Sequence, residues 1–108
     1  MATGTVQKNL NPSIVELASF TGTAEQNIAL ASTSNQFLFL CMVLYDSDGH
    51  IVNCVTAPPS VFQNVTCKIY GSSSSQWGSF VLSNDYARGT FNRTSANTSM
   101  IKVFGCMK

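Results

Sequence analysis

One stretch of the chain decides its fold: Gln36-Phe37-Leu38-Phe39-Leu40-Cys41-Met42-Val43-Leu44-Tyr45. Nine of these residues form an unbroken apolar run, which is too short to cross a bilayer as a helix, since that takes about 20 residues. Aromatic and β-branched side chains favour a strand, and an abrupt turn follows at Asp46-Ser47-Asp48-Gly49. The run therefore predicts a buried strand in the core of a soluble domain.

Both faces of this predicted strand are apolar. Alternation gives two sets: Phe37, Phe39, Cys41, Val43 and Tyr45 on one face, and Leu38, Leu40, Met42 and Leu44 on the other. Such a strand must be central in its sheet, with a second sheet over one face and another sheet, a loop or a neighbouring subunit over the other. If a neighbouring copy covers the second face, the chain is a homo-oligomer with Phe37, Phe39 and Val43 at the interface between chains.

The remaining sequence predicts further short strands separated by turns rich in Gly, Pro, Asn and Ser. Residues 24–31 could form a helical turn or a strand, and we favour the strand. About seven to nine strands at this spacing are typical of an all-β, single-domain β-sandwich of antiparallel, jelly-roll-like form. Residues 1–12 are expected to be a polar N-terminal arm, and residues 13–108 the sandwich domain.

The turn after the central strand also predicts where two cysteines lie. Asp46-Ser47-Asp48-Gly49 has the form of a type I turn followed by a left-handed glycine, so that Asp46 pairs with His50. Continued without a break, this register places Cys41 opposite Val55 and leaves Cys41 and Cys54 on opposite faces of the hairpin. We expect all four cysteines (41, 54, 67 and 106) to be reduced packing residues.

Composition excludes several classes of partner. Charged residues make up 10% of the 108 residues, against about 25% in ordinary soluble domains. Six basic and five acidic residues are spread singly, so no basic stripe predicts nucleic-acid binding. The first residues lack the charged head and apolar segment of a signal peptide, and we expect no membrane insertion.

Catalytic and metal-binding patterns are weak. His50 is the single histidine, and no serine or cysteine lies in a G-x-S-x-G context. The nearest cysteines are thirteen residues apart, and Asp46-Ser47-Asp48-Gly49 has its glycine two positions early for a calcium loop. We expect no catalytic residues, no metal and no cofactor, and therefore no enzyme.

Ligand recognition by exposed aromatic side chains is the chemistry that remains. The candidates are Trp77, Tyr70, Tyr86 and Arg88, which lie around the serine-rich loop 71–76 and could stack on sugar rings or hold a protein epitope. Two alternatives stay open: Trp77 as the anchor of the sandwich core, and Arg88 as an ordinary exposed strand residue.

The order of these features resembles a known group of proteins. The polar start, the apolar strand and turn from Phe37 to Gly49, the late Ile69-Tyr70-Gly71 and the closing Met100-Ile101-Lys102-Val103-Phe104-Gly105 resemble small β-rich structural proteins of tailed bacteriophages, of the head-fibre or tail-fibre type. The resemblance implies a virion component, commonly trimeric, that is assembled in the bacterial host cytoplasm and displayed for host attachment. Its arm would bind other virion proteins. The alternative function is a soluble, lectin-like carbohydrate-binding module.

Overall fold

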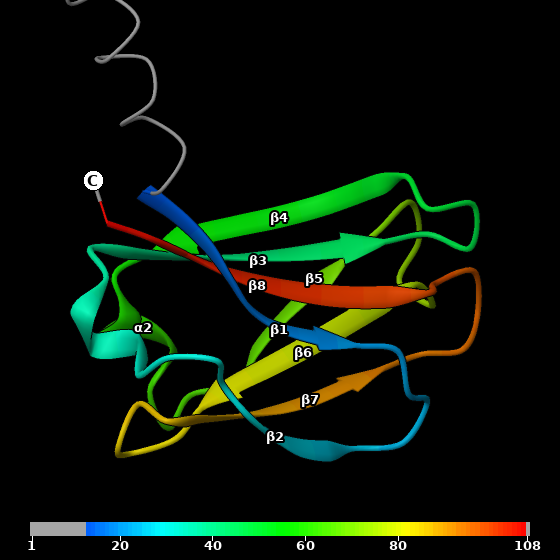
Figure 1. Cartoon of the computed structure of the whole chain (residues 1–108). Helices are drawn as coiled ribbons and strands as arrows, with labels where there is room; N and C mark the ends of the chain where they lie inside the picture. Colours follow the sequence, from blue (N-terminus) through cyan, green and yellow to red (C-terminus); the bar gives the residue numbers. More distant parts are fainter. Residues whose placement is uncertain (1–12, 108) are drawn as a thin grey trace, which may run out of the picture.

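A computed structural model describes residues 13–107 as two antiparallel sheets packed face to face (Figure 1). The all-β sandwich prediction is confirmed, and the predicted arm lies outside the described residues. The strands are β1 (Ile14–Phe20), β2 (Gln26–Ala29), β3 (Phe39–Tyr45), β4 (Ile51–Ala57), β5 (Cys67–Tyr70), β6 (Trp77–Leu82), β7 (Arg88–Arg93) and β8 (Met100–Cys106). A 3-10 turn, η2 (Ser34–Gln36), and one helical turn, α2 (Pro59–Phe62), complete the fold. No helix in this part of the chain is long and apolar enough to span a membrane.

Each sheet has four strands. Sheet A has the order β1-β8-β3-β4 and sheet B the order β2-β7-β6-β5, so the chain crosses between sheets four times. β3 lies between β8 and β4, as expected for a strand that is apolar on both faces. The segment 24–31 contains the strand β2, which confirms the preferred alternative.

The core lies between the two sheets and is rich in phenylalanine. Leu40, Met42 and Leu44 point inward from β3 with no exposed surface. From sheet B, Phe80 and Phe91 pack together with ring centroids 5.0 Å apart. Phe20, from β1, stacks on Phe91 at 5.6 Å. Such a continuous apolar layer supplies the main stabilisation of a domain of this size.

Phe37 belongs to this core and not to the outer surface. β3 begins only at Phe39, so the alternation that would place Phe37 beside Phe39 and Val43 does not extend back to it. Phe37 is 6% exposed and packs on Gly105 of β8. Phe37 therefore does not share the outer face with Phe39 and Val43 as predicted, because its ring is already buried within its own protomer.

Two β-bulges change which side chains share a face. In β1 the register shifts between Glu16 and Ala18, and consequently both Leu17 and Ala18 point inward. In the β3–β4 hairpin, Asp46 N donates to His50 O at 2.8 Å as predicted, but the register then shifts between Leu44 and Tyr45.

The second bulge overturns the prediction for the hairpin cysteines. Cys41 pairs with Thr56, and Cys54 pairs with Val43. Because paired residues share a face, Cys41 and Cys54 lie on the same outer face of sheet A. Cys54 is exposed, so it is not the buried packing residue that we expected.

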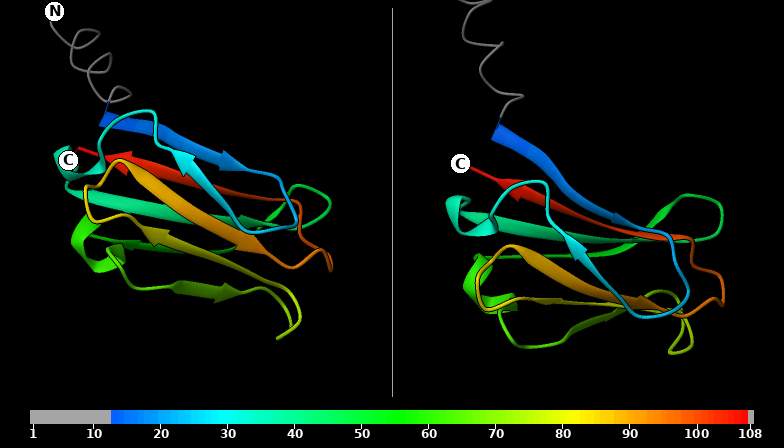
Figure 2. Two further views of the ribbon diagram at one scale, coloured as in Figure 1. Left: turned by 90° about the horizontal axis from the view of Figure 1, so that it is seen from below. Right: turned by 60° about the horizontal axis from the view of Figure 1, so that its bottom comes forward.

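The sandwich has two different ends (Figure 2). At the terminal end, β1 begins and β8 ends, and Met107 N donates to Ser13 O at 2.8 Å. At the loop end lie the turns that follow β1, β3, β5 and β7, which are residues 21–25, 46–50, 71–76 and 94–99. The start of β1 and the end of β8 therefore lie at one end of the sandwich, and four polar loops lie at the other.

Candidate functional site

The outer face of sheet A is the most unusual surface of the molecule. It consists of the residues that alternate with the buried ones in β1, β8, β3 and β4. Ten of them are apolar or carry sulfur: Ile14, Phe39, Cys41, Val43, Tyr45, Ile51, Cys54, Met100, Phe104 and Cys106. Phe39 and Val43, the other two residues predicted at an interface between chains, are among them. Phe39 is 41% exposed, whereas Val43 is 6% exposed.

The charged residues of this face neutralise each other. Lys102 Nζ lies 3.0 Å from Glu16 Oε1, across the β1–β8 pair. This hydrogen bond to Glu16 raises the pKa of Lys102. The pair lowers the desolvation free energy of covering the face with another apolar surface, since the two opposite charges would be buried as a pair.

The outer face of sheet B is different, because it is mainly polar. Asn27 on β2 is exposed, and Ser79, Thr90 and Asn92 are half-buried residues that point outward and alternate with the buried aromatic residues of β6 and β7. A solvated face of this kind is ordinary for an antiparallel sheet, whereas the face of sheet A is not.

Trp77 and Tyr70 lie side by side on this polar face, at the loop end. The two residues pair across β5 and β6. Lys68 lies on the same face, with its Nζ 4.4 Å from the centre of the Trp77 ring and 5.6 Å from that of Tyr70. We call these three residues the Trp77 cluster. Trp77 is half-buried and points outward, so it is not the anchor of the core.

Tyr86 and Arg88 do not join this cluster. They lie before and at the start of β7, at the terminal end, whereas Trp77 begins β6 at the loop end. Tyr86 packs against the core and donates from its hydroxyl to Gln63 Oε1 at 3.2 Å. Arg88 donates to both the side chain and the carbonyl of Asn27 on β2. The four residues predicted from their closeness in sequence thus form two separate groups.

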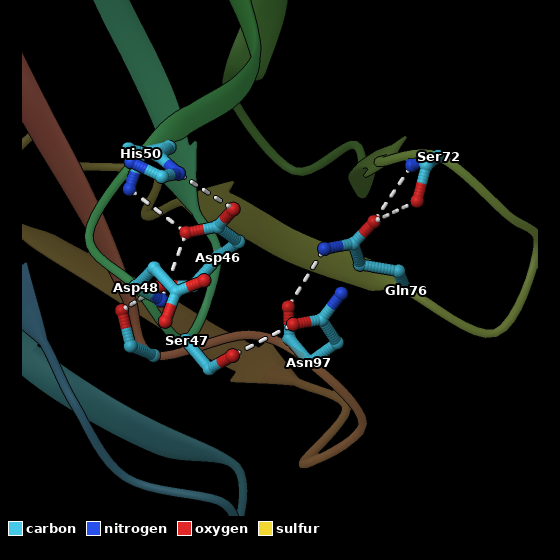
Figure 3. Close-up of polar contacts among 8 residues, drawn as sticks. Asp46, Ser47, Asp48, His50, Ser72, Gln76 and Asn97 are labelled. Atoms are coloured by element: carbon cyan, nitrogen blue, oxygen red, sulfur yellow. Dashed lines mark hydrogen bonds and ion pairs between the residues drawn. The ribbon is translucent and has the colours of Figure 1, made fainter.

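The serine-rich loop 71–76 is held in place by one buried side chain. Gln76 is 2% exposed, and its Oε1 accepts hydrogen bonds from Ser72 N at 2.6 Å and Ser72 Oγ at 2.9 Å (Figure 3). Its Nε2 donates to Asn97 O at 2.7 Å. Asn97 in turn accepts from Ser47 Oγ at 2.7 Å. Three loops are therefore linked into one polar surface at the loop end.

The turn at residues 46–50 gathers three possible metal ligands. Atoms of Asp46, Asp48 and His50 lie within 4.8 Å of one another. However, Asp46 Oδ1 already accepts hydrogen bonds from Asp48 N at 2.9 Å and His50 N at 2.8 Å. The bond from His50 N is the main cause that lowers the pKa of Asp46. Turn formation accounts for this arrangement, and the His50 side chain is 75% exposed.

Arg93 is a buried residue that the sequence pattern did not single out. It is 8% exposed and points into the loop end of the sandwich. Its guanidinium donates to Thr98 O at 3.0 Å, Thr98 Oγ1 at 3.0 Å and Thr21 O at 2.7 Å. Its Nε has no partner within residues 13–107, and burial lowers the pKa of the group. A single basic residue in a polar strand gives no sign of this position.

Comparison with protein-family models, curated proteins and solved structures finds no match for this chain. Residues 13–107 enclose no ligand-sized cavity. The surfaces available for recognition in this part of the molecule are therefore the open sheet faces and the loop end.

Proposed function

We propose that this chain is a non-enzymatic structural subunit of a bacteriophage virion, a fibre or decoration component that acts as a homo-oligomer. One observation carries the proposal: the outer face of sheet A is apolar, whereas that of sheet B is polar. The sequence resemblance to small phage fibre proteins supports a virion as the particle, and the apolar sheet face supports assembly through sheet A. The resemblance implies a trimer, whereas two A faces that pair about a two-fold axis give a dimer, and the measured oligomeric state distinguishes the two.

The area of this face matches that of a small interface between copies. Four strands spaced about 4.8 Å apart, with some seven residues each at about 3.3 Å per residue, cover roughly 440 Å² per copy. Two copies would therefore bury about 880 Å², an area typical of weak or transient interfaces and larger than most crystal-packing contacts. Phe39 and Ile14, which are 41% and 60% exposed, would lose most of their contact with water.

The two ends of the sandwich support a division of roles. Ser13 and Met107 lie together at the terminal end, so whatever precedes Ser13 leaves the fold there. A polar arm at this end would bind other virion proteins. The linked loops at the opposite end would then face outward for host attachment, to a surface glycan or protein.

Light scattering coupled to size-exclusion chromatography tests the assembly. We expect an oligomer at micromolar concentration and a monomer for Phe39→Lys, since the new charge would be buried at the interface. Tyr70→Lys is the matched control, because Tyr70 is 44% exposed on the outer face of sheet B, and it should leave the oligomer intact. A wild-type monomer would refute the proposal.

A lectin-like carbohydrate-binding module is the second candidate. The Trp77 cluster favours it, because aromatic rings beside a cation and linked polar loops can stack on sugars and donate hydrogen bonds to them. On a glycan array, Trp77→Ala should abolish binding, whereas Tyr86→Ala, at the other end, should not. Binding that survives Trp77→Ala would exclude this site.

A further inference from the structure

Three of the four cysteines form a diagonal stripe on the outer face of sheet A. Cys106 of β8 is opposite Phe39, two residues before Cys41. Cys54 of β4 is opposite Val43, two residues after Cys41. The stripe therefore crosses three neighbouring strands, with Cys41 at its centre.

Disulfide bonds within one chain do not suit this stripe. Diagonal neighbours in an antiparallel pair lie about 7–8 Å apart, whereas the Cα atoms of a disulfide are usually 4.4–6.8 Å apart. All four thiols are free in the structure. Cys67, by contrast, pairs with Phe80 and points into the core, where burial raises the pKa of its thiol.

We propose that the stripe forms disulfide bonds between two copies of this chain when their outer A faces meet. This inference rests on the proposed self-association and adds a covalent step to it. The partner on this face is a second copy of the chain, because the charges of the face are self-complementary. Glu16 and Lys102 sit on adjacent strands, so a copy turned by 180° can place Lys102 against the other copy's Glu16.

The positions of the three thiols are also compatible with a two-fold axis between the copies. A two-fold axis in the plane of the interface that runs along the stripe places each thiol against its own counterpart. An axis that crosses the stripe at Cys41 places Cys54 against Cys106 of the other copy and Cys41 against itself. Both arrangements bring sulfur to sulfur across the interface.

The chemistry is thiol–disulfide exchange with a small-molecule disulfide such as oxidised glutathione. A thiolate of one copy attacks the small disulfide, which releases one small thiol and leaves a mixed disulfide on the protein. A thiolate of the second copy then attacks the protein sulfur of that mixed disulfide and releases the second small thiol. Two protein thiols are oxidised, one small disulfide is reduced to two thiols, and the two protons pass to the small thiols. An assembly formed in a reducing cytoplasm would become cross-linked in an oxidising exterior.

Oxidative cross-linking of the full chain tests the inference. Reduced protein is treated with oxidised glutathione, quenched with an alkylating reagent and analysed on non-reducing gels, and the linked peptides are mapped by mass spectrometry. We expect linked dimers or larger species joined through Cys41, Cys54 or Cys106 and not through Cys67. Cys67→Ser should cross-link as the wild type does, and the triple variant Cys41→Ser, Cys54→Ser, Cys106→Ser should not.

Phe39→Lys separates an interface from random collision, because it keeps every thiol. We expect cross-linking to slow at least tenfold, while alkylation after denaturation counts the same four free thiols as in the wild type. An unchanged cross-linking rate, or glutathione adducts alone, would overturn the inference. If light scattering shows a reduced oligomer that gives no link between chains, the thiol proposal fails and the assembly proposal stands. A reduced monomer that gives no link overturns both.

Discussion

Phe37 packs so closely on Gly105 that a Cβ at this glycine would lie 2.7 Å from the Phe37 ring. Gly105→Ala should therefore push the ring out of its place and reduce the free energy of unfolding by about 1–3 kcal/mol. Urea denaturation followed by Trp77 fluorescence measures the change.

The double variant Phe37→Ala, Gly105→Ala provides the control for this contact. Removing the ring costs stability on its own but also removes the clash with the new methyl group. The two changes should then be less than additive, by at least about 1 kcal/mol. Simple additivity would show that the contact does not limit position 105.

Arg93 joins the loops after β1 and β7 through its fork of N–H donors. Arg93→Lys keeps the charge but cannot reach Thr21 O and Thr98 O at once, so buried carbonyls lose their donors. We expect a loss of about 1–3 kcal/mol in the free energy of unfolding. Arg88→Lys, on the exposed face of the same strand, should change it by less than about 0.5 kcal/mol.

Gln76 is expected to control the mobility of the serine-rich loop. Gln76→Ala removes the acceptor for Ser72 N and the donor to Asn97 O. Amide hydrogen exchange within residues 72–76 should accelerate about tenfold, which corresponds to about 1.4 kcal/mol of local opening, while the amides of β3 keep their rates. Unchanged exchange in the loop would show that the side-chain bonds do not order it.

Asp46 predicts a pH dependence of stability with a definite sign. Hydrogen bonds from backbone amides, first that of His50, lower the pKa of Asp46 below its ordinary value of 3.8. A carboxyl group whose pKa is lower in the folded state stabilises the fold above its unfolded pKa, and this contribution disappears as the pH falls through the folded pKa.

Asp46→Asn should therefore lower the melting temperature near pH 7, and the difference from wild type should shrink as the pH falls below about 4. Thermal unfolding between about pH 2 and pH 7 measures it. Asp48→Asn removes a charge from the same turn and serves as the control. A difference that grows towards low pH would contradict the assignment.

Local pattern predicted the strands well and the composition of the faces only in part. It located β3 in the apolar run and β2 within residues 24–31, because hydropathy and alternation need only neighbouring residues. It failed for Cys41 and Cys54, because one extra residue in β4 reverses the side-chain direction beyond it. For Trp77 and Tyr86, closeness in sequence gave no contact, since β6 runs the length of the sheet between them and separates their ends.

The sequence by itself determined the fold class, the central position of β3 and the turn at Gly49, which adopts a φ of +83°. These features follow from hydrophobic period and from turn residues, which act over a few positions. Only the tertiary structure decided that Phe37 is buried, that Arg93 bridges two loops and that three thiols share one face. These depend on bulges and on packing between strands distant in sequence, where a shift of one residue exchanges inside for outside.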